Sequence, residues 1–133
     1  MGNVFFDDLN NNNLESLLLW IFSQTNNFTL IHAVTSHHAF EYLKKFSLNE
    51  RDARIYFWKT LLAAYLTTTG TAKISFDWSY PDIQLSSWDK LKKLAIQDQD
   101  NHVIKLVHTL SEKNRSDLDF ELRYAASLKL RVI

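Results

Sequence analysis

Histidine side chains are the groups of this sequence best suited to acid–base or metal chemistry. Three of the five, His32, His37 and His38, fall close together in the segment FTLIHAVTSHHAFEYLKKF, residues 28–46. An imidazole titrates near neutral pH, so it can transfer a proton, orient a ligand or bind a metal ion. The chain has no cysteine, which removes thiol nucleophiles and thiolate metal sites from consideration.

The 28–46 segment is expected to be a helix, and helical geometry separates its three histidines. With Phe28 as the origin, a step of about 100° per residue places His32 at about 40°, inside a stripe of apolar side chains. That stripe consists of Phe28, Ala39, Leu43 and Phe46. We therefore expect His32 to point inward. It is either a structural histidine hydrogen-bonded to a neighbouring helix or an acid–base or ligand-orienting group that lines a pocket.

His37 and His38 are expected to point away from that stripe. The same geometry puts His37 at about 180°, where it forms an i, i+4 pair with Glu41 that we expect to be solvated. His38 lies on the flank and precedes Glu41 by three, which reverses the order of Glu and His in di-iron bundles. A metal site would need His32 and His102 to converge with a third ligand, and nothing in the spacing demands this.

The other two histidines, His102 and His108, belong to a second expected helix, residues 101–112. The buried side of this helix is formed by Val103, Leu106, Val107 and Leu110. His102 and His108 fall on opposite shoulders, each more than about 100° from the centre of that side. We expect both to be boundary residues that touch water.

The composition favours long helices with polar connections. The chain has 133 residues, 46% of them hydrophobic, with two glycines and one proline. An all-β fold of this length would need many tight turns, which consume Gly and Pro. We predict an all-α, single-domain bundle of five or six helices over residues 1–133, with residues 1–13 frayed. The expected helices span 14–24, 28–46, 47–69, 86–96 and 101–112, with a sixth beginning at 116.

The third expected helix has the widest apolar arc and is predicted to be central. Ser47 and Glu50 have the spacing of a capping box at its start, and Gly70 suits a left-handed cap at its end. An arc that covers more than a third of the circumference indicates contacts with several neighbours. The arc comprises Ile55, Trp58, Leu61, Leu62, Tyr65 and Leu66. We expect the second, third and fifth helices to form the core.

Charge and hydropathy exclude two classes of partner. The formal net charge is zero, with 15 basic and 15 acidic residues, so there is no basic excess for nucleic acid. The apolar run 17–22 is too short to span a bilayer, so no membrane interaction is expected. The lack of cysteine suits a reducing compartment, and we expect a cytoplasmic protein.

Three motifs in the same order resemble the carboxy-terminal portion of the questin oxidase-like family. They are HAVT at 32–35, LAAYLTTTG at 62–70 and DNHVIK at 100–105, within a resemblance that spans residues 28–112. The resemblance implies oxidative chemistry on an aromatic or polyketide-type substrate, of the Baeyer–Villiger type that uses NADPH and O₂. It also singles out His32 and His102, which match the family pattern.

From this resemblance we expect an oxidoreductase-related pocket between the second and fifth helices, with His32 and His102 as its catalytic residues. The residues expected to contact a small aromatic substrate are Thr35, Trp58, Tyr65 and Lys105. Members of the family are typically several hundred residues long. We therefore expect a homo-oligomer, or a partner chain that supplies the remaining portion of the family architecture.

Two other functions stay open, and so does the question of whether the chain is an enzyme. The first is a non-catalytic helical interaction or dimerisation module that uses its aromatic surface. The second is a metal-binding helical bundle. If the chain is an enzyme, the resemblance implies an NADPH- and O₂-dependent oxidoreductase, whereas the residues themselves indicate no cofactor.

Overall fold

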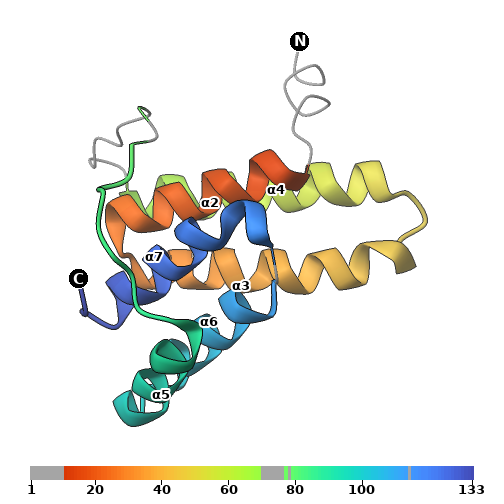
Figure 1. Cartoon of the computed structure of the whole chain (residues 1–133). Helices are drawn as coiled ribbons and strands as arrows, with labels where there is room; N and C mark the ends of the chain where they lie inside the picture. The colour runs from red at the N-terminus through yellow and green to blue at the C-terminus, as the bar shows by residue number, and fades with distance from the viewer. Residues whose placement is uncertain (1–10, 70–76, 78, 114) are drawn as a thin grey trace.

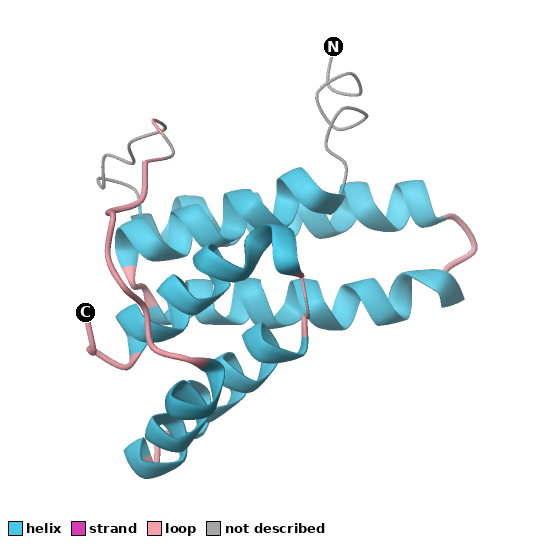
Figure 2. Cartoon of the chain, in the orientation of Figure 1, coloured by secondary structure: helices cyan, strands magenta, loops and turns pink. Residues whose placement is uncertain are grey.

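The computed structural model describes residues 11–69, 77, 79–113 and 115–133, and within these residues the fold is all-α. The described residues form six α-helices and two short 3₁₀ helices, with no strand among them, which confirms the predicted fold class (Figure 2). The α-helices are α2 (Asn11–Thr25), α3 (Phe28–Leu43), α4 (Glu50–Thr69), α5 (Trp88–Asp98), α6 (Asn101–Glu112) and α7 (Asp119–Lys129). The 3₁₀ helices are η1 (Lys44–Phe46) and η2 (Ser116–Leu118).

Helix α3 lies at the centre of the arrangement. It packs against α2 on one side, α4 on another and α6 on a third. Helix α7 covers α2 and α6, and α5 and α6 form an antiparallel pair that is inclined to the other helices (Figure 1). A two-residue connection joins α2 to α3, and a second two-residue connection joins α5 to α6.

Polar side chains begin the helices that position the site. Asn27 accepts a hydrogen bond from the Thr29 N–H at 2.8 Å at the start of α3. Asp100 accepts one from the His102 N–H at 2.8 Å at the start of α6. Each cap satisfies a backbone donor that the first helical turn leaves without a partner. Before these caps, Asn26 and Gln99 adopt left-handed φ values of 45° and 63°, which reverse the chain between the paired helices.

The apolar core is built from α2, α3, α5, α6 and α7, together with one side of α4. Its largest fully buried side chains include Trp20 and Phe22 of α2 and Leu106 of α6. Helix α3 contributes Leu30, Ile31, Ala33 and Val34. Among the described side chains of α4, only Trp58 and Leu61 are buried in this core, and the partly buried Phe57 packs against it.

The prediction that residues 47–69 form a central helix is wrong. Helix α4 makes its main contacts with α3 and η1, and the α3–α4 hairpin extends away from α5 and α6 (Figure 1). Tyr56, Leu62 and Leu66 on α4 are 69%, 50% and 61% exposed. The apolar arc of this helix is wider than the part that α3 and η1 cover, so some of its apolar side chains face outward.

The start of α4 also differs from the expectation. The cap is made by Asn49, whose side-chain oxygen accepts from the N–H groups of Arg51 at 3.0 Å and Asp52 at 3.2 Å. The hydroxyl of Ser47 instead donates to the Lys44 carbonyl at 2.7 Å, so the expected capping box does not form. Gly70 and residues 1–10 lie outside the described part of the chain, while Asn11–Thr25 forms α2 and so includes the end of the segment expected to fray.

Among the described residues, no helix combines the length and the apolar character needed to cross a bilayer.

Removing one core side chain tests this packing. We expect Leu106→Ala to lower the free energy of unfolding by about 3 kcal/mol, because Leu106 is fully buried and its loss leaves a cavity. Ile96→Ala is the control, since Ile96 is 67% exposed on α5 and its loss should change stability far less. Urea denaturation followed by circular dichroism measures both. Equal effects of the two substitutions would contradict the packing described above.

Candidate functional site

The expected rotation of α3 is wrong, and His32 is exposed. The stripe that we took for the buried side is on the outside of the helix, with Phe28 53%, Leu43 63% and Phe46 77% exposed. The buried side is the opposite one, formed by Leu30, Ile31, Ala33, Val34 and His37. Both sides of α3 are apolar, so the helix periodicity did not distinguish them. A pocket centred on a buried His32 is therefore absent from the described structure.

His37 takes the buried position instead. Its side chain is 3% exposed, where we expected a solvated group, and its ring lies 6.0 Å from that of Phe57 on α4. Its Nε2 atom makes no hydrogen bond within the described structure, and the nearest carboxylate oxygen, Oε1 of Glu41, is 3.7 Å away. The i, i+4 pair that the sequence indicated is present, but it faces inward.

His32 and His102 meet on the surface of the molecule. Their ring centroids are 5.5 Å apart and their planes are almost perpendicular. Phe28 completes the group, with its ring 5.2 Å from that of His32 and 4.7 Å from that of His102. We call His32 and His102 the imidazole pair. Asp100 contacts one member of the pair, with its Oδ1 atom 3.2 Å from Nδ1 of His102.

The other predicted site residues do not gather around the imidazole pair. The Thr35 hydroxyl donates to the Ile31 carbonyl of its own helix at 3.1 Å. Lys105 is exposed on α6. Trp58 and Tyr65 belong to α4, where Trp58 is buried and its indole N–H finds no acceptor among the described residues. The expected substrate-binding set is thus divided between the α3–α4 hairpin and α6.

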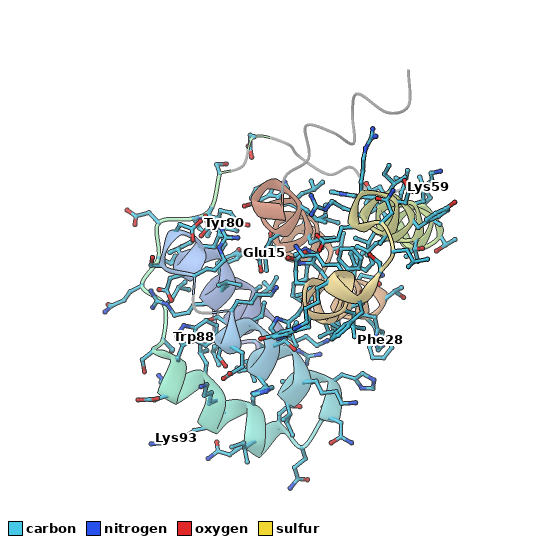
Figure 3. All side chains as sticks on the ribbon, turned by 90° about the vertical axis from the view of Figure 1, so that its right-hand side faces the viewer. Glu15, Phe28, Lys59, Tyr80, Trp88 and Lys93 are labelled. Atoms are coloured by element: carbon cyan, nitrogen blue, oxygen red, sulfur yellow. The ribbon has the colours of Figure 1, made fainter. Side chains whose placement is uncertain are left out.

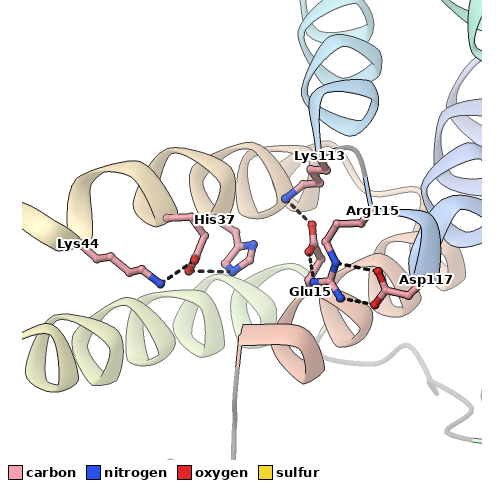
Figure 4. Close-up of polar contacts among 7 residues, drawn as sticks. Glu15, His37, Lys44, Lys113, Arg115 and Asp117 are labelled. Carbon is pink, nitrogen blue, oxygen red and sulfur yellow. Dashed lines mark hydrogen bonds and ion pairs between the residues drawn. The ribbon is translucent and has the colours of Figure 1, made fainter.

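A buried carboxylate that the sequence analysis missed lies on the other side of α3. Glu15 on α2 is 5% exposed, and its Oε1 is 2.5 Å from Lys113 Nζ. Its Oε2 accepts from Arg115 Nη1 at 3.0 Å, and Arg115 also binds Asp117 (Figure 4). We call Glu15, Lys113 and Arg115 the Glu15 cluster. Glu15 points into the space between the helices, whereas Phe28 lies at the outer edge of the molecule (Figure 3). The one sequence feature that could have indicated this buried carboxylate is the position of Glu15 beside the apolar residues of α2.

A pocket of about 340 Å³ lies between the Glu15 cluster and α3. Its α3 wall carries His37 and Glu41, and His38 and Tyr42 also line it. Glu41 Oε2 accepts a hydrogen bond from Lys44 Nζ at 2.7 Å, which holds the carboxylate beside the His37 ring (Figure 4). The pocket therefore joins two titratable groups of α3 to the ion pairs of the Glu15 cluster.

The environment of His37 keeps its imidazole neutral. Burial, together with the nearby positive charge of Lys113, lowers the pKa of His37 from 6.5 to about 4, although Glu41 acts in the opposite direction. The pKa of His38 is also lowered, mainly by partial burial and then by Lys113. At pH 7 both rings can donate or accept a hydrogen bond without carrying charge.

Metal binding lacks a ligand set within the described part of the chain. Among residues 11–69, 77, 79–113 and 115–133, no group of three or more His, Asp or Glu side chains is placed to hold a metal ion. The imidazole pair supplies two nitrogens, and the carboxylate nearest to it, Asp100, contacts His102 Nδ1.

The buried imidazole predicts a pH dependence of stability. Because the unfolded chain takes up this proton near pH 6.5 and the folded chain only near pH 4, acidification across that window favours unfolding. The free energy of unfolding should fall by about 1.4 kcal/mol per pH unit between those values through this group. His37→Phe should flatten that part of the profile, whereas the exposed His108→Phe should keep it. Parallel wild-type and His37→Phe profiles would refute the assignment.

Comparison with known proteins places the chain in a family. The sequence model of the Questin oxidase-like family matches residues 22–110, which is well over half of the chain. The matched region contains both members of the imidazole pair, and Glu15, Lys113 and Arg115 lie outside it. No curated protein and no solved structure matches the sequence. The extent of the family match leads to one conclusion: this chain belongs to the Questin oxidase-like family.

Proposed function

We propose that this chain contributes the imidazole pair to an oxidoreductase site for a small aromatic substrate, and that a second protein surface completes the site. That surface belongs to another copy of the chain or to a partner chain. Family membership supports oxidative chemistry, and the exposed apolar stripe of α3 supports a covering surface. A stripe of this kind costs free energy in water and gains it when covered.

The meeting of His32 with His102 is the observation that carries the proposal. The two residues come from motifs at opposite ends of the family match, yet their rings are in contact. Two imidazoles at this separation can act on one substrate, with one ring accepting a proton while the other donates. The contact between Asp100 and His102 Nδ1 favours a proton on that nitrogen and leaves Nε2 as the acceptor.

Phe28 gives this site an aromatic wall. Its ring stands edge-on to both imidazoles and remains half exposed, so a flat substrate can lie against it. Lys105 does not contact the pair, but it is exposed and follows His102 by three residues on α6, so its positive charge can attract a phenolate toward that side of the helix. The Phe28 ring orients the substrate, and the two imidazoles accept and donate its protons.

NADPH, which the family resemblance implies, does not fit this surface alone. His32 is exposed and the His102 side chain is 41% exposed, so a dinucleotide laid across them would keep much of its surface in water. Bound cofactors are usually buried over about 70–90% of their surface. A complete nucleotide site would therefore need the second surface, and we assign no step of the reaction to the cofactor.

Turnover tests the proposal. Purified protein with NADPH, O₂ and a polycyclic quinone should consume NADPH, and His32→Ala and His102→Ala should each lower kcat/KM by about 100-fold or more. His108→Ala is the matched control, because His108 is an exposed histidine of α6 outside the pair and should leave the rate unchanged. Turnover that survives His32→Ala would remove the imidazole pair from the chemistry.

A non-catalytic interaction module is the second candidate, and the uncovered hairpin favours it. Leu43 at the end of α3, Phe46 in η1 and Leu66 on α4 all remain more than half exposed. Two α3–α4 hairpins can cover such surfaces by forming a four-helix arrangement.

Light scattering and turnover together separate the two candidates, because another copy of the chain could complete the site in the first one as well. A dimer should be seen whose mass falls on dilution, and Phe46→Asp should convert it to monomer because a charge would then lie in the covered stripe. Ile96→Asp, on exposed α5, serves as control and should leave the dimer intact. If His32→Ala and His102→Ala keep the dimer and no quinone is turned over, the interaction module is favoured. A monomer at every concentration would count against it.

A further inference from the structure

We propose that the pocket between α2, α3 and the end of α6 binds a small neutral phenol, whose hydroxyl group lies between His37 Nε2 and Glu41 Oε1. This inference concerns a different site from the imidazole pair and does not rest on oxidoreductase activity. The pocket and the pair lie on different sides of α3, because His37 is on its buried side and His32 on its exposed side.

The unsatisfied imidazole nitrogen is the first step of the argument. The His37 side chain is 3% exposed, and its Nε2 atom has no hydrogen-bond partner among the described residues. A buried polar atom without a hydrogen-bond partner destabilises the folded chain. The ring lines the pocket, so a ligand there can supply the missing hydrogen bond.

The gap between the two α3 groups selects a hydroxyl. Nε2 of His37 and Oε1 of Glu41 are 3.7 Å apart, which is too far for a direct hydrogen bond. A hydroxyl oxygen at about 2.8 Å from both can accept from the Nε2 proton and donate to the carboxylate. Glu41 is held for this role by Lys44, which binds its other oxygen at 2.7 Å.

The charges around the pocket select a neutral molecule. The His37 ring is itself uncharged, with a pKa lowered to about 4 by burial and by Lys113. Lys113 and Arg115 are paired with buried Glu15, so neither cation is available to neutralise an anion. An anion would also face the carboxylates of Glu41 and Glu112, while the carboxylates of Glu15 and Glu41 are already bound by Lys113, Arg115 and Lys44 and offer less attraction to a cation.

The size and rim of the pocket select a single aromatic ring. A volume of about 340 Å³ is near the lower limit of small-molecule sites, which span about 300–1,000 Å³. The rings of His38 and Tyr42 line the pocket and meet edge to face at 5.1 Å. Tyr42 is 62% exposed, so its ring can lie against a ligand that enters from solvent.

Titration with 4-methylphenol, followed by the NMR signals of the histidine rings, tests the assignment. We expect saturable binding that shifts the His37 signals, and at least tenfold weaker binding of toluene, which has the same ring and methyl group but no hydroxyl. His37→Phe should weaken the binding of 4-methylphenol at least tenfold. Glu41→Gln should weaken it by a similar factor, although the glutamine side chain keeps the shape of the pocket. His108→Phe, outside the pocket, should bind as the wild type does.

Each contrary result overturns the proposal. The first such result is that the wild type shows no saturable binding of 4-methylphenol, and the second is that it binds toluene with the same affinity. The third is that His37→Phe and Glu41→Gln both bind 4-methylphenol as tightly as the wild type does. Circular dichroism shows whether His37→Phe is folded; if it is not, Glu41→Gln decides, because Glu41 is partly exposed and its amide is isosteric. Loss of quinone turnover with intact phenol binding would reject the oxidoreductase proposal and leave this one standing.

Discussion

Helix α3 can bury only one of its two apolar sides, and the rest of the structure depends on which one is buried. His32 and His37 are five positions apart, or about 140° around a helix, so they cannot both face the core. Burial of Leu30, Ile31, Ala33 and Val34 turns His37 inward and His32 outward. One rotation thus produces both arrangements: a buried, neutral imidazole beside a pocket, and an exposed imidazole whose ring lies 5.5 Å from that of His102 on α6.

The Glu15 cluster forms the wall of the pocket that lies opposite α3. A carboxylate in the apolar interior requires partners, and Glu15 finds them in Lys113 and Arg115, which follow the last turns of α6. These ion pairs tie the start of α2 to the connection between α6 and α7. They also hold positive charge near the His37 ring, which adds to the effect of burial on its pKa. The same ion pairs therefore connect the helices around the pocket and place the positive charge that lowers the pKa of His37.

Local sequence signals predicted the elements well and their orientation poorly. The helix over 101–112, the helix beginning at Phe28 and the all-α class were predicted and are confirmed. The rotation of α3 was not predictable from periodicity, because apolar residues occupy both sides and only the neighbouring helices choose between them. The central place assigned to α4 failed for the same reason. The contact of His32 with His102 depends on how α3 crosses α6, which spacing along one helix does not encode.

The attachment of α4 has a consequence for how the molecule opens. Because α4 contributes only two buried side chains, Trp58 and Leu61, and the partly buried Phe57 to the described core, it can separate from α3 while α2, α6 and α7 stay packed. Local unfolding of this kind needs less free energy than global unfolding, and amide hydrogen exchange detects it. The backbone of the hairpin would exchange early in the isolated chain and late once its outer surface is covered. Protection of α4 would then report assembly directly, whichever function that assembly serves.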